Sequence, residues 1–159
     1  MFRARFAAVS IFLFSLTAVC SAQSSASCNL DNGSQVRLTY NPVSAKSEKI
    51  SNGKPWSPGG APMLLFTETQ LSFGGSTIPI GAYTVYPIPG KEWTLVVNKN
   101  VTAGAAYDEK QDLARAPMET DQVSQPSDSL EVAFAHTGEK CTLRIYFGKA
   151  ASFAPFTAK

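Results

Sequence analysis

Apolar and polar residues alternate with a period of two in several parts of the chain. The clearest ranges are 36–40, 130–134 and 141–147, in which every second side chain is apolar. This period is typical of a β-strand with one buried face, whereas an amphipathic helix repeats after about 3.6 residues. We therefore predict strands over these three ranges.

The middle of the chain reads as a meander of short strands separated by glycine and proline. We expect strands here over 66–73, 76–80, 82–86 and 93–98. Gly74 and Gly75 tolerate the positive φ of a tight hairpin turn, and Pro79, Pro87 and Pro89 are confined to strand ends or edges. Many short strands with turns between them predict an all-β fold, a single antiparallel β-sandwich or barrel-like domain with short irregular connections.

Three segments depart from this pattern. Residues 41–62 contain four prolines and three glycines, and we expect a long surface loop, a class of segment that often carries function. Residues 119–129 are polar, include Pro126 and are expected to form a connector. Asp108, followed three residues later by Gln111, predicts the start of a short helix.

The amino terminus is typical of a secretory signal peptide over residues 1–22. Arg3 and Arg5 precede a largely apolar run of 14 residues over 6–19, and a bilayer span needs about 20 apolar residues. We expect an exported protein, periplasmic or extracellular, whose mature part is a single all-β domain over 23–159 without a membrane span.

Cleavage after Ala22 places two small side chains, Cys20 and Ala22, at the positions that signal peptidase reads. The alternative is a lipid anchor on Cys20. It is disfavoured because Val19, rather than a small residue, precedes that cysteine.

Cleavage would leave Cys28 and Cys141 as the remaining thiols, and an even count in an exported chain favours one disulfide. Closing a loop this long stabilises a fold by roughly 4 to 5 kcal/mol in the chain-entropy model. A nucleophilic cysteine paired with His136 is the alternative. It needs a free thiol, and His136 is expected to lie in a solvated turn between two strands.

Charge and the inventory of reactive residues narrow the function further. Removing Arg3 and Arg5 from 14 basic residues leaves 12 against 12 acidic ones, so we expect no binding to nucleic acid through bulk charge. His136 is the one histidine of the sequence. A catalytic triad or a transition-metal site is therefore not expected, and we expect no catalytic residues, cofactor or metal.

Carboxylates offer two further candidate sites. The densest acidic cluster, Asp108, Glu109 and Asp112, lacks the spacing of a calcium loop and is expected to be a solvated face. Glu68 and Glu131 both fall in predicted strands, and no pattern in the sequence places them together for glycoside hydrolysis.

A longer motif runs through the middle of the chain. It comprises Gly74-Gly75, Pro79-Ile80-Gly81-Ala82-Tyr83, Pro87, Trp93-Thr94 and Asn98-Lys99. Supporting segments are Ala106-Tyr107-Asp108, Leu113-Ala114-Arg115, Cys28 and Cys141-Thr142-Leu143-Arg144. Together they resemble the DUF2911 family, exported bacterial domains of unknown function, over most of residues 28–150. The resemblance implies a strand over 113–118.

The loop of this family usually carries Arg-Pro-Ser, Lys-Gly-Arg and Trp-Arg-Thr-Gly-Ala-Asn. The equivalent segments here are Asn41-Pro42-Val43, Ala45-Lys46-Ser47 and Trp56-Ser57-Pro58-Gly59-Gly60-Ala61. The two arginines and the asparagine are absent, while Trp56, Lys46 and the glycines remain. The family implies no reaction for this chain.

Trp56, Lys46 and Tyr107 are the candidate ligand-binding residues. Aromatic side chains form platforms for sugars or peptides, and Trp56, flanked by proline-containing pairs, is expected to be more exposed than Trp93, which we place in the core beside Leu95. We expect a non-catalytic binding or structural module whose ligand is an envelope glycan or a peptide. The alternative is an envelope hydrolase or transferase that uses the 41–62 loop.

Overall fold

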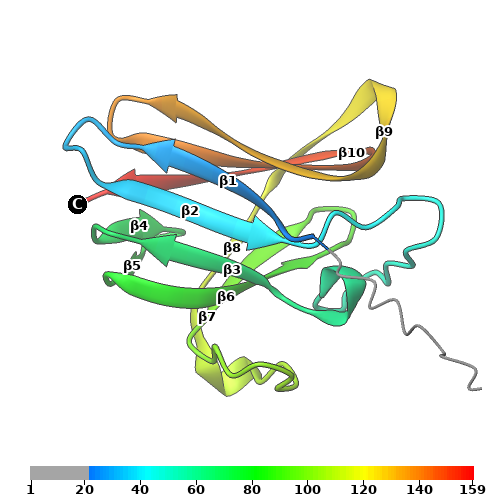
Figure 1. Ribbon diagram of the computed structural model, residues 1–159, viewed down its shortest axis with the longest axis horizontal. Helices are drawn as coiled ribbons and strands as arrows, with labels where there is room; N and C mark the ends of the chain where they lie inside the picture. Colours follow the sequence, from blue (N-terminus) through cyan, green and yellow to red (C-terminus); the bar gives the residue numbers. More distant parts are fainter. Residues whose placement is uncertain (1–21) are drawn as a thin grey trace, which may run out of the picture.

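The computed structural model describes residues 22–159. This part of the chain forms two antiparallel sheets packed face to face (Figure 1). The six-stranded sheet has the order β1-β2-β3-β6-β7-β8, and the four-stranded sheet has the order β5-β4-β10-β9. The two sheets do not close into a barrel, so the predicted β-sandwich is confirmed.

The strands of the six-stranded sheet are β1 (Ser24–Asn29), β2 (Gln35–Tyr40), β3 (Met63–Thr67), β6 (Gly81–Ile88), β7 (Thr94–Asn98) and β8 (Asp112–Pro117). The four-stranded sheet contains β4 (Leu71–Phe73), β5 (Ser76–Ile78), β9 (Glu119–Thr137) and β10 (Lys140–Ala158). Two short 3₁₀-helices interrupt the loops, η1 (Pro58–Gly60) and η2 (Glu109–Gln111). The strand that the family resemblance implies over 113–118 is β8.

The core lies between the sheets and follows the alternation of the sequence. In β2, Val36, Leu38 and Tyr40 are buried while the residues between them are more exposed. Phe73 of β4 stacks on Phe156 of β10, with ring centroids 4.7 Å apart. Burial of these apolar side chains is the main force that holds the two sheets together.

The strand expected over 66–73 is wrong, because the chain changes sheets in its middle. β3 ends at Thr67 and β4 begins at Leu71. The buried Thr67 hydroxyl donates to the carbonyl of Thr69 at 2.6 Å and accepts from the Thr69 amide at 3.3 Å. A hydroxyl that bonds the nearby backbone competes with the strand ladder, and here it closes the turn that sends the chain across.

The hairpin predicted at Gly74 and Gly75 is confirmed between β4 and β5. Both residues have positive φ, 55° and 81°. A Cβ atom on Gly74 would lie 2.5 Å from the Cβ of Ala116 in β8. Gly74 is therefore required for two reasons: its backbone has a positive φ, and a side chain there would collide with β8 where the two sheets approach each other.

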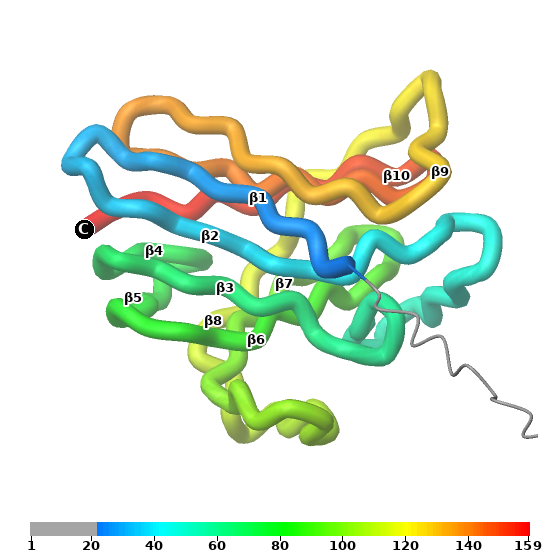
Figure 2. The backbone as a smooth tube through the Cα atoms, in the orientation of Figure 1, coloured from blue at the N-terminus to red at the C-terminus, as the bar shows by residue number. Residues whose placement is uncertain are grey.

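The connector expected over 119–129 is also wrong, because these residues belong to the long strand β9. Figure 2 shows the chain passing from β8 straight into this strand. Between the pairs Gln122↔Ala150 and Ser127↔Gly148, β9 advances five residues while β10 advances two. Residues 123–126 consequently bulge out of the ladder. The segment is polar because β9 is an exposed edge strand. Its composition therefore resembles that of a loop, although several of its residues pair with β10.

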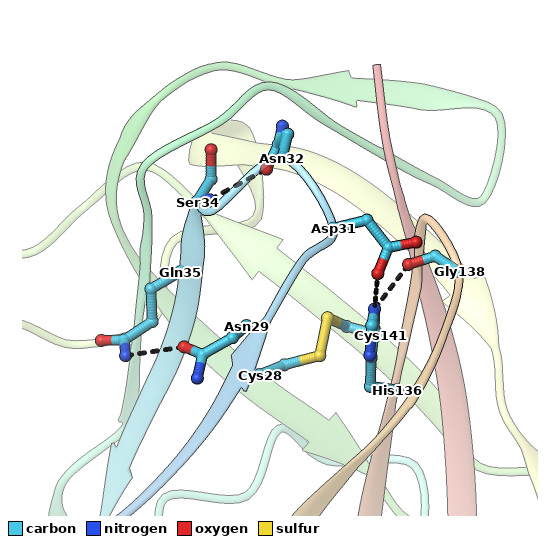
Figure 3. The surroundings of a disulfide bond; sticks show 9 residues. All are labelled: Cys28, Asn29, Asp31, Asn32, Ser34, Gln35, His136, Gly138 and Cys141. Atoms are coloured by element: carbon cyan, nitrogen blue, oxygen red, sulfur yellow. Dashed lines mark hydrogen bonds and ion pairs between the residues drawn. A yellow bond between two sulfur atoms is a disulfide. The ribbon is translucent and has the colours of Figure 1, made fainter.

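The predicted disulfide is confirmed between Cys28 of β1 and Cys141 of β10, with the two Cα atoms 6.1 Å apart (Figure 3). Both cysteines are buried. His136 pairs with Cys141 across the β9–β10 ladder, and its Nε2 atom lies 3.4 Å from the Asp31 carboxylate. His136 is solvent-exposed, as predicted, but it lies in β9 just before the hairpin turn and not in the turn itself.

Within residues 22–159 no helix is both long and apolar enough to cross a membrane. The predicted signal peptide, apart from its last residue, and Cys20 lie outside the described residues.

Candidate ligand cleft

Trp56 is buried, which contradicts the exposure expected from the sequence. Its exposed fraction is 5%, against 7% for Trp93. The indole packs 4.8 Å from the ring of Phe147 and edge-on to Trp93 at 6.3 Å, and its Nε1 donates to Glu48 at 3.0 Å. The Trp56 ring is therefore an anchor that holds the 41–62 loop on the sandwich.

Two further hydrogen bonds hold the 41–62 loop. The backbone amide of Trp56 donates to the carbonyl of Pro87 at 2.8 Å, at the end of β6. Pro87 itself lies one residue before the end of β6, near a strand end as predicted. The Glu48 carboxylate also accepts the amide of Gly59 at 3.2 Å. One acidic side chain thus joins two distant parts of the loop.

Lys46 is exposed and lies beside β9. Its ammonium group is 3.4 Å from the Asp128 carboxylate, and its side chain is 82% exposed. The neighbouring backbone amide of Ala45 donates to the carbonyl of Asp128 at 2.9 Å. An exposed ion pair of this kind contributes little to stability. Lys46 and Trp56 contact different residues, so the structure does not bring them together in one site.

Tyr107 belongs to a polar cluster on the face of the six-stranded sheet that points away from the core. Its hydroxyl donates to Asp112 at 2.7 Å and accepts from Arg115 at 2.8 Å. Arg115 also donates to the same carboxylate oxygen at 2.7 Å, and Asn98 donates to the other oxygen at 2.8 Å. The Tyr107 ring packs on Tyr86, 4.9 Å between centroids.

These contacts set the ionisation of the cluster. Burial, followed by the hydrogen bond and charge of Asp112, raises the pKa of Tyr107 to about 12, against an opposing effect of Arg115. The hydrogen bond to Asp112 raises the pKa of Arg115 as well. The phenol stays protonated at neutral pH and cannot act as a base, so the geometry favours a role in anchoring residues 99–111 to the sheet.

The acidic cluster is only partly the solvated face that the sequence predicts. The Asp112 side chain is 14% exposed and accepts the hydrogen bonds just described, whereas Glu109 is mostly exposed. The cap expected at Asp108 is confirmed, because its carboxylate accepts the amide of Lys110 at 3.0 Å at the start of η2.

A cleft of ≈ 470 Å³ opens where the β6–β7 turn meets β9 and β10. We call it the Trp93 cleft. Its lining comes from three segments distant in sequence: Gly90, Lys91, Trp93, Thr120, Asp121, Gln122, Lys149 and Ala150. The sequence predicts a core position for Trp93, and none of the other lining residues is among its candidate site residues.

Trp93 is mostly buried, as expected, and supports the cleft from inside. Its carbonyl accepts the amide of Met118 at 2.7 Å, and Trp56 packs against its ring. The Trp56 anchor therefore acts on the cleft indirectly, through Trp93.

The lining of the cleft contains two basic side chains and one acidic side chain. Lys91 and Lys149 are exposed, and neither ammonium group lies within 4.0 Å of a carboxylate in residues 22–159. Asp121 provides the one carboxylate of the lining and accepts the amide of Gln122 at 2.7 Å. The lining contains no histidine and no second acid, so it lacks a pair for general acid–base chemistry.

Metal binding has no candidate cluster in the described part of the chain. Within residues 22–159 no three His, Cys, Asp or Glu side chains gather closely enough to hold an ion.

The profile of a family described as "Protein of unknown function (DUF2911)" matches residues 21–155. The chain belongs to the DUF2911 family. The comparison with curated proteins and the comparison with solved structures each gave no match.

The motif that carries the resemblance to DUF2911 has structural roles here. Gly74 and Gly75 form the β4–β5 turn, the Tyr83 hydroxyl donates to the carbonyl of Pro79 at 2.9 Å, and Asn98 ties β7 to Asp112. Trp93 is the member of the motif that reaches the cleft. The motif includes Trp93, but the sequence predicts only a core position for it, because a cleft completed by β9 and β10 leaves no signal in a local motif.

Proposed function

We propose that this DUF2911 chain is an exported, non-catalytic binding module whose ligand occupies the Trp93 cleft. The observation that carries the proposal is the pair of lysines, Lys91 and Lys149, that flank a mostly buried tryptophan without a carboxylate partner. Ligand sites commonly combine an aromatic floor with a few polar groups that fix orientation.

Export is supported by two independent features. The basic start and the apolar run over 6–19 are typical of a signal peptide cleaved after Ala22. The Cys28–Cys141 disulfide is typical of an oxidising compartment. We place the mature protein in the periplasm or outside the cell, without a lipid on Cys20.

A binding role is favoured over catalysis because of what lines the cleft. Glycoside hydrolysis uses two carboxylates about 5 to 9.5 Å apart, and Asp121 has no second carboxylate in the lining. The alternative, an envelope hydrolase or transferase using the 41–62 loop, has less support. It would rest on Trp56, which is buried, and on Lys46, which pairs with Asp128.

The test is a thermal-shift screen of the oxidised protein, expressed with its N-terminal segment and purified from the periplasm. The ligands are neutral and carboxylated envelope oligosaccharides and peptides. A ligand at about 100 times its Kd should add about 2.7 kcal/mol of stability. We expect this stabilisation to be lost in the Lys149→Gln, Gln122→Ala double variant.

Lys140→Gln is the matched control, because Lys140 is exposed at the far end of β10. Stabilisation by no ligand, or stabilisation unchanged in the double variant, would contradict a ligand site in the Trp93 cleft. Turnover that depends on Lys46 would instead favour the enzyme alternative.

A further inference from the structure

We infer that the ligand of the Trp93 cleft is a carboxylated oligosaccharide whose acidic sugar lies between Lys91 and Lys149; this inference rests on the proposed function. It follows from the charge of the cleft, from the chemistry of its remaining lining and from a second hollow that adjoins it.

The positive charge of the cleft is local. Residues 23–159 carry 12 basic and 12 acidic side chains, whereas the cleft lining has two lysines and the single carboxylate of Asp121. Each ammonium group offers three hydrogen-bond donors and no acceptor. A carboxylate satisfies such donors with charge-assisted hydrogen bonds, which are stronger than neutral ones.

The rest of the lining favours a sugar over a peptide. Thr120 and Gln122 supply a hydroxyl and an amide, which both donate to and accept from neighbouring sugar hydroxyls, and Asp121 supplies a carboxylate, which accepts from them. Apart from Trp93, the largest apolar side chain of the lining is that of Ala150. Recognition of a peptide through its apolar side chains needs pockets that hold them, and the lining of this cleft provides none.

A second hollow of ≈ 450 Å³ shares the lining residue Thr120 with the cleft, and we place the further rings of a longer ligand there. This hollow is lined by Phe153 and Pro155 together with two acids, Glu92 and Glu119. Acidic walls repel a second carboxylate. The geometry therefore orients the ligand, with its acidic ring at the lysines and neutral rings over the second hollow.

The experiment is calorimetric titration with matched pairs of probes. Each pair consists of an oligosaccharide that contains glucuronate, galacturonate, N-acetylmuramate or N-acetylneuraminate, and the methyl ester of the same compound. We expect at least one acid to bind about tenfold more tightly than its ester, the size of one charge-assisted hydrogen bond. This preference should shrink between about 0.05 M and about 0.5 M salt, because screening weakens exposed charges.

Variants then locate the effect. Lys91→Gln and Lys149→Gln should each reduce the preference for the acid several-fold while binding of the ester is retained, and Lys140→Gln should leave both unchanged. All three replace exposed side chains, and thermal melts verify that they fold.

Each outcome separates the two proposals. Equal binding of acid and ester, or a preference that survives both cleft variants, would overturn the carboxylated ligand and leave the cleft as a binding site. Binding of peptides alone would do the same. Binding of no probe in either this titration or the wider screen would overturn both.

Discussion

The two ends of the sandwich are held together by different forces. At one end, the β1–β2 and β9–β10 hairpins are joined by the Cys28–Cys141 disulfide, and Asp31 faces His136 (Figure 3). At the opposite end, the 41–62 loop lies near the β6–β7 turn (Figure 1). Contacts of Trp56 with Trp93 and Phe147, and hydrogen bonds, hold that end.

This difference separates stability from the candidate function. The disulfide closes a loop of 113 positions and ties the two sheets at one end. The Trp93 cleft lies where β9 residues 120–122 pair with β10 residues 150–152, far along the ribbon from the cross-link. We infer that the covalent end sets global stability while the packed end sets the shape of the cleft.

The largest effect should come from removing the disulfide. The Cys28→Ala, Cys141→Ala double variant should lose about 4 kcal/mol of unfolding free energy, because the unfolded chain regains the entropy of a long open loop. Urea unfolding with and without a reductant measures this loss. The double variant should be insensitive to the reductant, and a wild-type stability that the reductant leaves unchanged would contradict the assignment.

The second largest effect should come from the packed end. Trp56→Ala should cost about 3 kcal/mol by removing a buried ring. Trp56→Phe keeps most of the packing, loses the hydrogen bond to Glu48 and should cost about 1 kcal/mol. Hydrogen exchange should rise in the 41–62 loop and the β6–β7 turn. An equal rise at the disulfide end would show that the two ends are not independent.

Tyr107→Phe tests a region that belongs to neither end. Removing the hydroxyl should cost about 1 kcal/mol through the lost bonds to Asp112 and Arg115. Folding raises the pKa of this phenol from 10.0 to about 12. The stabilisation that the protonated Tyr107 hydroxyl gives to the folded state is therefore fully present below pH 10, and it is lost as the pH rises from 10 toward 12.

Urea midpoints measured across this pH interval provide the check. Wild-type stability should fall more steeply than that of Tyr107→Phe, and slopes that coincide would argue against the raised pKa. Ligand binding to the Trp93 cleft should be unchanged in this variant, since Tyr107 is absent from the lining.

The smallest effect is expected at Ser152. In residues 22–159 its Oγ is the buried side-chain oxygen without a hydrogen-bond partner. Removing an unpaired buried hydroxyl is neutral or stabilising, so Ser152→Ala should raise or leave unchanged the free energy of unfolding, within about 1 kcal/mol. A clear loss of stability in urea unfolding would mean that the hydroxyl has a partner in solution.

The alternation of apolar and polar residues predicted the strands that bury one face. It did not predict where the chain crosses from one sheet to the other, or where a strand is exposed at a sheet edge. Alternation located β2 and the hairpin arms around His136, because side chains in a strand face opposite sides in turn. It failed at 66–73, where the Thr67 hydroxyl closes a turn. It also failed at 119–129, where an exposed edge strand has few apolar residues to reveal it.

The candidate site was harder to predict than the fold. The sequence-based candidates Trp56 and Tyr107 anchor loops, and Lys46 pairs with an exposed aspartate. The prolines near Trp56 indicate an irregular backbone conformation. They do not show which residues, distant in sequence, the Trp56 ring contacts. Trp56 is buried because Phe147 and Trp93, far away in sequence, come to lie beside it.

The all-β class and the glycine turn at Gly74 and Gly75 follow from the sequence, because they depend on local stereochemistry. The pairing of Cys28 with Cys141 also follows from it, once Cys20 is assigned to the predicted signal peptide and two of the three cysteines are left. The position of Lys91 and Lys149 in the lining of one cleft follows from the packing of distant segments and not from any local pattern. The packing of the β6–β7 turn against the four-stranded sheet brings Lys91 to the cleft that Lys149 also lines, and the β9–β10 register with its bulge near Gly148 adds Gln122 to the same lining. Register is a property of paired strands, so neither segment alone contains it.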